Sequence, residues 1–236
     1  MPRIDGRAND DLRPVRITPG AQAFAEGSAL IEIGKTQVLC AVTTEDRVPA
    51  FLRGSGRGWV TAEYGMLPRS TLQRTPRDSQ QRGRAQEIQR LIGRSLRAIT
   101  NLDLLGDRTF TVDCDVLQAD GGTRTAAITG AYVALHQAMG RLYQAGALAT
   151  IPLAIPVAAV SVGVIFGEEL LDLCYEEDFR ASVDMNVVMT SSGEYAEGQA
   201  AAESKTFSQD QLQDLLGLAA QGIDQLITIQ KQIVTL

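Results

Sequence analysis

The stretch from Ala119 to Ala127 constrains the fold most, because it reads as the end of a strand, a tight turn and the start of a helix. Residues 109–117 before it alternate polar and apolar side chains and are rich in β-branched residues, which is typical of a half-buried strand. The residues after it are rich in alanine and keep a helical spacing. Gly121 and Gly122 lie between the two, where they allow positive φ angles and a close approach of a ligand to the backbone.

Such a turn predicts an anion-binding site at the start of the helix. The first N–H groups of a helix have no partner within it, and the helix dipole favours negative charge there. A phosphate would fit, with the planar guanidinium of Arg124 facing two of its oxygens. In the alternative interpretation Asp120 caps the helix, the glycines only make the turn and Arg124 is a surface residue. Because Gly-rich turns before helices are common, this stretch alone leaves both interpretations open.

The composition argues against several classes of protein. Hydrophobic residues make up 44% of the 236 positions, enough for a sizeable core. No window approaches the ~20 apolar residues of a membrane span, so a cytoplasmic protein without membrane contact is expected. His136 is the only histidine, which argues against a histidine-based triad and leaves proton or metal chemistry to carboxylates. The three cysteines form no CxxC pair, which predicts reduced thiols.

Charge is distributed unevenly along a chain whose net charge is −6. Residues 53–97 contain ten arginines against three acidic residues, whereas residues 167–236 contain thirteen acidic residues against three basic ones. This asymmetry predicts that the middle segment meets a polyanion. Within it, residues 67–83 show no periodicity and hold four arginines, so a long exposed loop is expected there, of a kind that is usually functional or disordered.

A helix with one apolar stripe is predicted from Arg84 onward. The stripe comprises Ile88, Leu91, Ile92, Leu96, Ile99 and Leu102. At about 100° per residue Arg84 falls on the same stripe, so it is expected to point inward, where its charge needs a structural carboxylate or a bound phosphate. Arg90, Arg94 and Arg97 fall on the opposite side and are expected to form a solvated or subunit-facing surface.

The remaining pattern predicts an α/β fold of mixed α+β type. Strands are expected at residues 15–18, 28–33, 36–44, 59–64, 109–117, 157–166, 170–174 and 183–190. Helices are expected at residues 84–102, 122–144 and 208–233. Strands and helices recur in a similar order, which predicts two related halves, about 1–150 and 151–236, packed as one domain.

Two pairs of carboxylates are candidates for metal binding. Asp178 is expected at a turn and Asp184 on the polar face of the next strand, so the two could converge on one hydrated Mg²⁺. Asp113 and Asp115 share one strand face near the glycine turn, and their alternative role is pairing with core-facing arginines. Sequence spacing favours Asp178 and Asp184 only slightly over Asp113 and Asp115 as the metal-binding pair.

Several long runs of residues, in the right order, resemble the bacterial ribonuclease PH family along nearly the whole chain. The runs are Gly27–Ser28, Lys35–Cys40, Gly58–Thr71, Glu87–Arg94, Asp113–Thr125 and Val183–Thr190. The resemblance implies an RNase PH-type domain with left-handed βαβ units, assembled as a homohexamer that is a trimer of dimers. It also implies a phosphate-dependent 3′-to-5′ exoribonuclease that removes nucleotides one at a time from the 3′ end of precursor tRNA and releases nucleoside diphosphates.

The resemblance also implies roles for individual residues. The attacking inorganic phosphate would be held by Arg84, Gly122, Thr123 and Arg124. Asp178 and Asp184 would bind Mg²⁺ and assist the leaving hydroxyl. Arg69, Arg74 and Arg77 would contact the tRNA.

One segment departs from the pattern of the family. Near residues 197–204 the family usually carries Gly-Thr-Ala-Glu-Gly, whereas this chain has Ala200, Ala201 and Ser204. Alanine cannot replace a glycine that needs positive φ, so the local geometry could differ. The segment carries none of the implied ligands, and activity is expected to survive.

Two other functions are open to a chain of this kind. A non-catalytic ring subunit that only binds RNA, as in exosome-like assemblies, is disfavoured because Arg84, Arg124, Asp178 and Asp184 are all present. A nucleotide-dependent kinase is disfavoured because the glycine turn lacks the GxxxxGK[ST] pattern.

Overall fold

The computed structural model describes residues 3–77, 83–202 and 206–234. The first of its two sheets has the strand order β1-β2-β3-β5-β4, in which β4 and β5 are parallel and the other neighbours antiparallel. These strands are β1 (Val15–Pro19), β2 (Gly27–Ile33), β3 (Thr36–Glu45), β4 (Trp59–Met66) and β5 (Thr109–Gln118). Helix α1 (Gly83–Ala98) connects the two parallel strands. A short 3₁₀ turn, η1 (Ala50–Leu52), precedes β4, and a second, η3 (Leu102–Leu104), lies between α1 and β5.

The second sheet is antiparallel, with the order β7-β6-β8-β9. Its strands are β6 (Val157–Ile165), β7 (Glu168–Leu171), β8 (Val183–Thr190) and β9 (Tyr195–Ala202). Helix α3 (Tyr175–Arg180) lies between β7 and β8 in the chain, and α4 (Gln209–Ile233) follows β9. In the parts of the chain described, no helix is long and apolar enough to cross a membrane.

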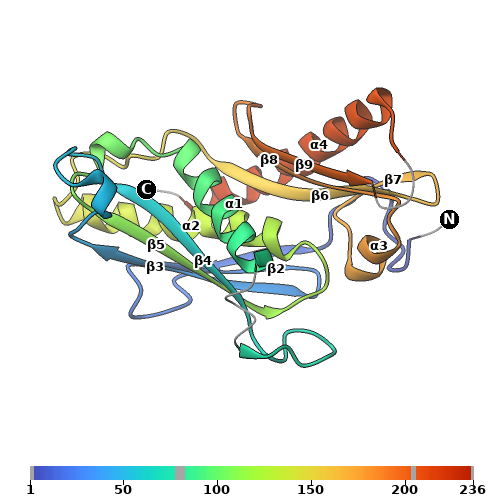
Figure 1. The fold of residues 1–236 in the computed structure, drawn as a ribbon, viewed down its shortest axis with the longest axis horizontal. Coiled ribbons are helices and arrows are strands. Elements are labelled where there is room, and N and C mark those ends of the chain that lie inside the picture. Colours follow the sequence, from blue (N-terminus) through green and yellow to red (C-terminus); the bar gives the residue numbers. More distant parts are fainter. Residues whose placement is uncertain (1–2, 78–82, 203–205, 235–236) are drawn as a thin grey trace.

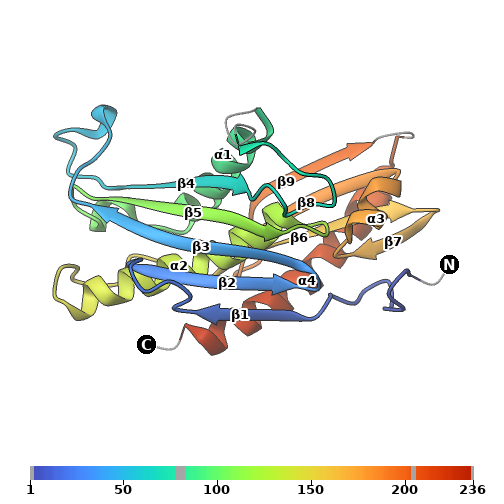
Figure 2. The ribbon, with the colours of Figure 1, turned by 90° about the horizontal axis from the view of Figure 1, so that it is seen from below.

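Helix α2 (Thr123–Gln144) lies between the two sheets, and α4 covers the far face of the second sheet (Figures 1 and 2). Strand β6 is therefore buried at every position. Its Ala159 belongs to the core around α2, whereas Val160 belongs to the core formed with α4. Small residues allow the layers to approach closely: a Cβ at Gly130 of α2 would lie 2.7 Å from Cγ2 of Ile31. The turn before α2 lies beside the second half, because a Cβ at Gly121 would lie 2.5 Å from O of Leu173.

Most of the predicted strands and helices are present, with four differences. The strand expected at residues 170–174 is β7, which begins at Glu168 and ends at Leu171. Strand β9 was not expected, because its sequence is exposed over most of its length and lacks an apolar alternation. Residues 175–179 were expected to form a turn but form most of α3. The helix predicted to reach Leu102 ends at Ala98, and Leu102 begins η3. On β8 the buried residues alternate with Asp184 and Asn186, as the pattern predicts.

Candidate active site

The glycine turn before α2 has the geometry that two glycines permit. Gly121 has φ +76°, and Gly122, the N-cap residue of α2, has φ +65°. Asp120 does not cap the helix: its carboxylate accepts a 3.4 Å hydrogen bond from the backbone N–H of Tyr175. Because the N-cap residue Gly122 has no side chain with which to cap α2, the first N–H groups of this helix suit an anion.

Thr123 and Arg124, in the first turn of α2, are each held by a polar neighbour. The hydroxyl oxygens of Tyr64 and Thr123 are 2.8 Å apart. Arg124 is half-buried and donates from Nη1 to Oε1 of Gln199, at 3.2 Å. Burial raises the pKa of Tyr64, so its phenol keeps its proton at neutral pH. Both implied phosphate ligands are therefore restrained before any ligand arrives.

Arg84 is exposed, which corrects the expectation that it points inward. It lies in the first turn of α1, and the buried face of that helix begins with Ala85 and Ile88. Its charge nevertheless acts on this site, because Arg84 opposes the rise in the pKa of both Tyr64 and Asp178. Arg84 thus reaches the site from solvent rather than from the core.

The acidic pair comes from α3 and β8. Burial, and then the charge of Asp184, raise the pKa of Asp178, whereas Arg124 and Arg84 act in the opposite direction. The four charged groups therefore lie within one electrostatic environment, although they come from α1, α2, α3 and β8. Asp178 as a whole residue is exposed, although its carboxylate is partly desolvated, and Asp184 is half-buried, so the pair is accessible to a ligand.

The second acidic pair lies elsewhere. Asp113 and Asp115 line a cavity of about 360 Å³ together with Glu63 and Gln89. Burial, then Asp115 and Glu63, raise the pKa of Asp113. The alternative role, pairing with core arginines, is not seen among the described residues, because the ion pairs found there do not include Asp113 or Asp115. The arginines of the glycine turn and of α1 thus act on Asp178 instead.

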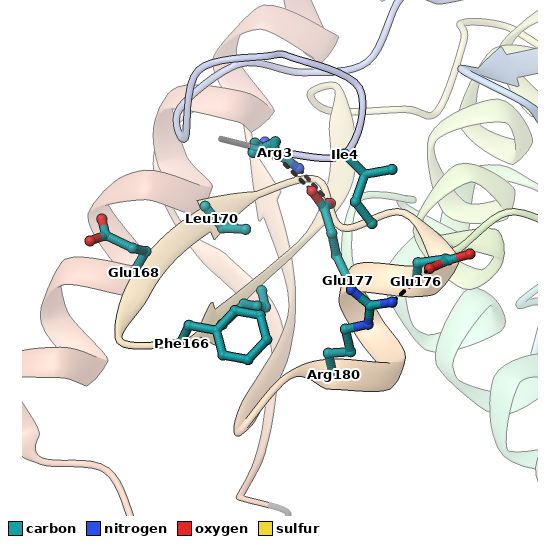
Figure 3. Close-up of a pocket in the computed structure, with 9 residues that line it drawn as sticks. Arg3, Ile4, Phe166, Glu168, Leu170, Glu176, Glu177 and Arg180 are labelled. Atoms are coloured by element: carbon teal, nitrogen blue, oxygen red, sulfur yellow. Dashed lines mark hydrogen bonds and ion pairs between the residues drawn. The ribbon is translucent and has the colours of Figure 1, made fainter. Parts of the chain in front are cut away.

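A buried ion pair holds α3 in place. Arg3 donates to both carboxylate oxygens of Glu177, at 2.9 and 2.7 Å, and the two side chains are 1% and 4% exposed (Figure 3). Glu177 also accepts from the N–H of Cys174, completing a capping box at the start of α3. Because Glu177 precedes Asp178, this pair fixes the helix that carries the acidic residue. Sequence analysis missed it, since the partners are 174 positions apart.

A second buried pair joins the glycine turn to the segment before α3. Arg13 donates from its backbone N–H, Nε and Nη2 to the carboxylate of Asp172, with Nη2 and Oδ1 2.6 Å apart. The third nitrogen of its guanidinium donates to the backbone oxygen of Asp120. Asp172 has φ +55°, a conformation that few residues other than glycine adopt, and this network holds it there.

The basic loop lies next to the turn. Arg69, Arg74 and Arg77 are exposed on the segment between β4 and α1, which extends away from the sheet in Figure 1. Its near end is fixed, because the N–H of Ala119 donates to the oxygen of buried Ser70 at 2.8 Å. Residues 78–82, which include the fourth arginine of the predicted loop, lie outside the described residues.

The departing segment is more closely involved than expected. Ala200 and Ala201 lie on β9 without positive φ, so replacing the family's glycine there causes no strain. Ser204 lies outside the described residues. Gln199 of the same segment contacts Arg124, so the segment supports a candidate ligand even though it holds none.

The outer arginines of α1 are only partly solvated. Arg90 is exposed, as expected. Arg94 forms a 2.9 Å ion pair with Glu197 of β9, and the guanidinium carbon of Arg97 lies 4.4 Å from the ring centroid of Trp59. Of the three arginines expected on a solvated or subunit-facing surface, Arg90 therefore fits best, whereas Arg94 and Arg97 contact neighbouring strands.

Comparisons with known proteins identify the family of the chain. Residues 11–139 match the model of the 3′ exoribonuclease family, domain 1, and residues 156–222 match domain 2. Ribonuclease PH of Dehalococcoides mccartyi is 58% identical over 99% of this chain and 98% of that protein. Ribonuclease PH of Solibacter usitatus is 55% identical, over 98% and 99%.

Two solved structures share the fold at low sequence identity. Rice (Oryza sativa) Rrp46 aligns with a TM-score of 0.80 and 21% identity, over 99% of this chain and 100% of that one. The Archaeoglobus fulgidus exosome with RNA bound to the active site aligns with a TM-score of 0.80 and 22% identity, over 95% and 91%. Both family models and the near full-length identity lead to one assignment: the chain belongs to the ribonuclease PH family of 3′ exoribonucleases.

Proposed function

We propose that this phosphorolytic 3′-to-5′ exoribonuclease of tRNA precursors binds its co-substrate phosphate at Gly122, Thr123 and Arg124, with Arg84 completing the site. The observation that carries the proposal is the uncapped start of α2, beside one half-buried and one exposed arginine. The acidic pair lies in the same electrostatic environment. A site of this kind suits a tetrahedral oxyanion.

The reaction brings two anions together. An oxygen of inorganic phosphate attacks the phosphorus of the last phosphodiester. The bond from that phosphorus to the 3′ oxygen of the preceding nucleotide breaks, and that oxygen takes up a proton. The products are a nucleoside diphosphate and an RNA that is one nucleotide shorter. Arg84, Arg124 and the start of α2 offset the repulsion between the anions, and positioning supplies much of the rate.

Asp178 and Asp184 suit a magnesium ion and the leaving oxygen. The two carboxylates interact electrostatically, and in the described parts of the chain no group of three or more His, Cys, Asp or Glu residues forms a metal cage. A pair of carboxylates fits Mg²⁺, which keeps several waters and takes further oxygens from substrate phosphates. The ion, when bound, would spread the charge on the transferring phosphoryl group. The same pair is proposed to assist the leaving 3′ oxygen.

The exposed arginines at 69, 74 and 77 are proposed to contact the tRNA. They lie on a segment that Ser70 ties to the glycine turn, so RNA bound to them would pass close to the phosphate. Replacing all three with alanine should weaken tRNA binding and reduce the slope of log K against log salt, because each phosphate contact contributes about 0.9 to that slope. An unchanged slope would exclude the loop from the interface.

Larger features implied by the family are part of the proposal. The two halves, about residues 1–150 and 151–236, are proposed to form one domain, with the β4–α1–β5 unit as a left-handed crossover. A homohexameric ring, built as a trimer of dimers, and a cytoplasmic location remain predictions.

A tRNA with additional 3′ nucleotides tests the reaction directly. Shortening should require both phosphate and Mg²⁺ and should release nucleoside diphosphates, whereas nucleoside monophosphates formed without phosphate would contradict phosphorolysis. The Asp184→Asn variant separates the enzyme from a non-catalytic RNA-binding subunit, since it should bind tRNA but lose turnover. A variant that retained turnover would remove Asp184 from the proposed machinery.

A further inference from the structure

Three side chains from three elements form a hydrogen-bonded relay beside the phosphate site. Arg124 of α2 donates from Nη1 to Oε1 of Gln199 on β9, at 3.2 Å. Gln199 donates from Nε2 to Oε1 of Glu87 on α1, at 3.0 Å. Because a guanidinium can only donate and a carboxylate can only accept, one orientation of the amide satisfies both neighbours. Glu87 therefore determines that the amide oxygen faces Arg124.

The strand that carries Gln199 is itself held against α1. Glu197, two residues earlier on β9, forms the 2.9 Å ion pair with Arg94. In the register of β8 and β9, Gln199 lies opposite Asn186, and Ala201 lies opposite Asp184. Residues two apart on a strand share a face, so Gln199 is on the same face of the second sheet as Asp184. The relay thus joins Arg124 to the sheet that holds the acidic residue.

The chemistry of the partner distinguishes Arg124 from the structural arginines of this molecule. Arg3 is paired with Glu177 at 2.7 Å, and Arg13 with Asp172 at 2.6 Å, so carboxylates balance both charges. Arg124 is held by a neutral amide instead. A carboxylate in that place would fix the guanidinium but would also cancel the charge that attracts phosphate.

We infer that Gln199 is a positioning residue that orients Arg124 toward phosphate through a neutral contact, which adds no negative charge beside the guanidinium. The inference rests on the proposed role of Arg124 in binding phosphate. Gln199 occupies one N–H group of a guanidinium that has five, so the remaining donors stay available to the oxyanion. Glu87 acts one step further away, by setting the orientation of the amide.

Two substitutions of Gln199 test the two parts of this role. Gln199→Met keeps the length of the side chain but removes the acceptor, and Gln199→Glu introduces a carboxylate. Gln89→Met is a matched control, because Gln89 donates to Glu63 at 2.6 Å from the same helix as Glu87. Phosphate affinity is measured by calorimetry without RNA, and KM for phosphate and kcat are measured with precursor tRNA at saturating Mg²⁺.

Gln199→Met should weaken phosphate binding and raise KM about five- to tenfold, since a hydrogen bond to a charged group is lost, with kcat within about twofold of wild type. Gln199→Glu should weaken binding further, because the new carboxylate both pairs with Arg124 and repels phosphate. Gln89→Met should match wild type. In an Arg124→Met background, Gln199→Met should have no additional effect on phosphate affinity, which a merely structural role would not produce.

Unchanged phosphate affinity in Gln199→Met, or an equal loss in Gln89→Met, overturns the inference. Thermal unfolding verifies that each variant folds. If Gln199→Met does not fold, unchanged phosphate affinity in Gln199→Glu is sufficient to overturn the inference. The proposed function fails separately: it fails if wild-type protein shortens tRNA without consuming phosphate. Phosphorolysis by wild type, combined with unaffected Gln199 variants, overturns this inference alone.

Discussion

Replacing Gly121 with alanine tests whether the glycine turn is shaped by its contact with the segment before α3. The φ of +76° costs an L-residue about 1–2 kcal/mol. An added Cβ would lie 2.5 Å from O of Leu173, 2.7 Å from C of Cys174 and 2.8 Å from N of Tyr175, all of them backbone atoms. Crowding of this kind adds about 1–3 kcal/mol, so Gly121→Ala should lower the free energy of unfolding by about 2–5 kcal/mol.

Two other glycines separate strain from crowding. Gly146 has φ +73° and nothing within 4 Å of an added Cβ, so Gly146→Ala should cost only about 1–2 kcal/mol from backbone strain. Gly122 has φ +65°, and the nearest atoms are side-chain atoms of Arg13 and Thr125 at 3.2 Å, which can move slightly. Gly122→Ala should therefore cost little more than Gly146→Ala and clearly less than Gly121→Ala.

Urea unfolding at one fixed protein concentration measures these differences, because any oligomerisation makes apparent stability depend on concentration. Gly121→Ala should also lower kcat for phosphorolysis, since the displaced backbone leads directly into the helix that carries Asp178. Gly146→Ala should retain wild-type kcat. Equal losses of stability in Gly121→Ala and Gly146→Ala would refute the packing argument.

Two further predictions concern α3. In metal-free buffer Asp178→Asn should raise the urea midpoint of unfolding at pH 7, because desolvation and the charge of Asp184 raise the pKa of Asp178 and so disfavour its charged form in the folded protein. The stability that the protonated carboxyl contributes is fully present below the ordinary pKa of 3.8 and is lost as the pH rises through the pKa of the folded state. A gain that did not vary with pH would contradict this cause. Arg3→Met should cost up to about 3–5 kcal/mol in urea unfolding, because buried Glu177 would lose its bidentate partner and keep only the N–H of Cys174 and Arg7 at 3.7 Å. Arg180→Met, at an exposed pair, should cost less than about 1 kcal/mol. Similar losses in the two variants would argue against the buried pair.

Local chemistry made parts of the site predictable from sequence. Gly121 and Gly122 take the positive φ that only glycine adopts readily, and the strand and helix around them carry clear periodicity. The polar face of β8 followed from alternation, so Asp184 was placed correctly relative to Met185. In each case a short stretch of sequence contains all the residues that determine the local structure.

The parts that sequence reasoning missed depend on residues far apart in the chain. Gln199 was overlooked because β9 is an exposed edge strand without apolar alternation, and its link to Arg124 spans 75 positions. Arg84 was expected inside because helical periodicity gives the face of a helix but not where the covering layer ends. Arg3 and Arg13 lie in a polar, irregular arm, and nothing local indicates that their partners follow 174 and 159 residues later.

The separation of Arg3 from Glu177 and of Arg13 from Asp172 has a consequence for synthesis of the protein. Translation proceeds from the N-terminus, so the first residues leave the ribosome long before residues 172–177 exist. The glycine turn and α3 cannot be held together by these pairs until about three quarters of the polypeptide has been made. A nascent chain is therefore without a finished catalytic centre while it is still beside the ribosome's own RNA and the tRNAs that serve it.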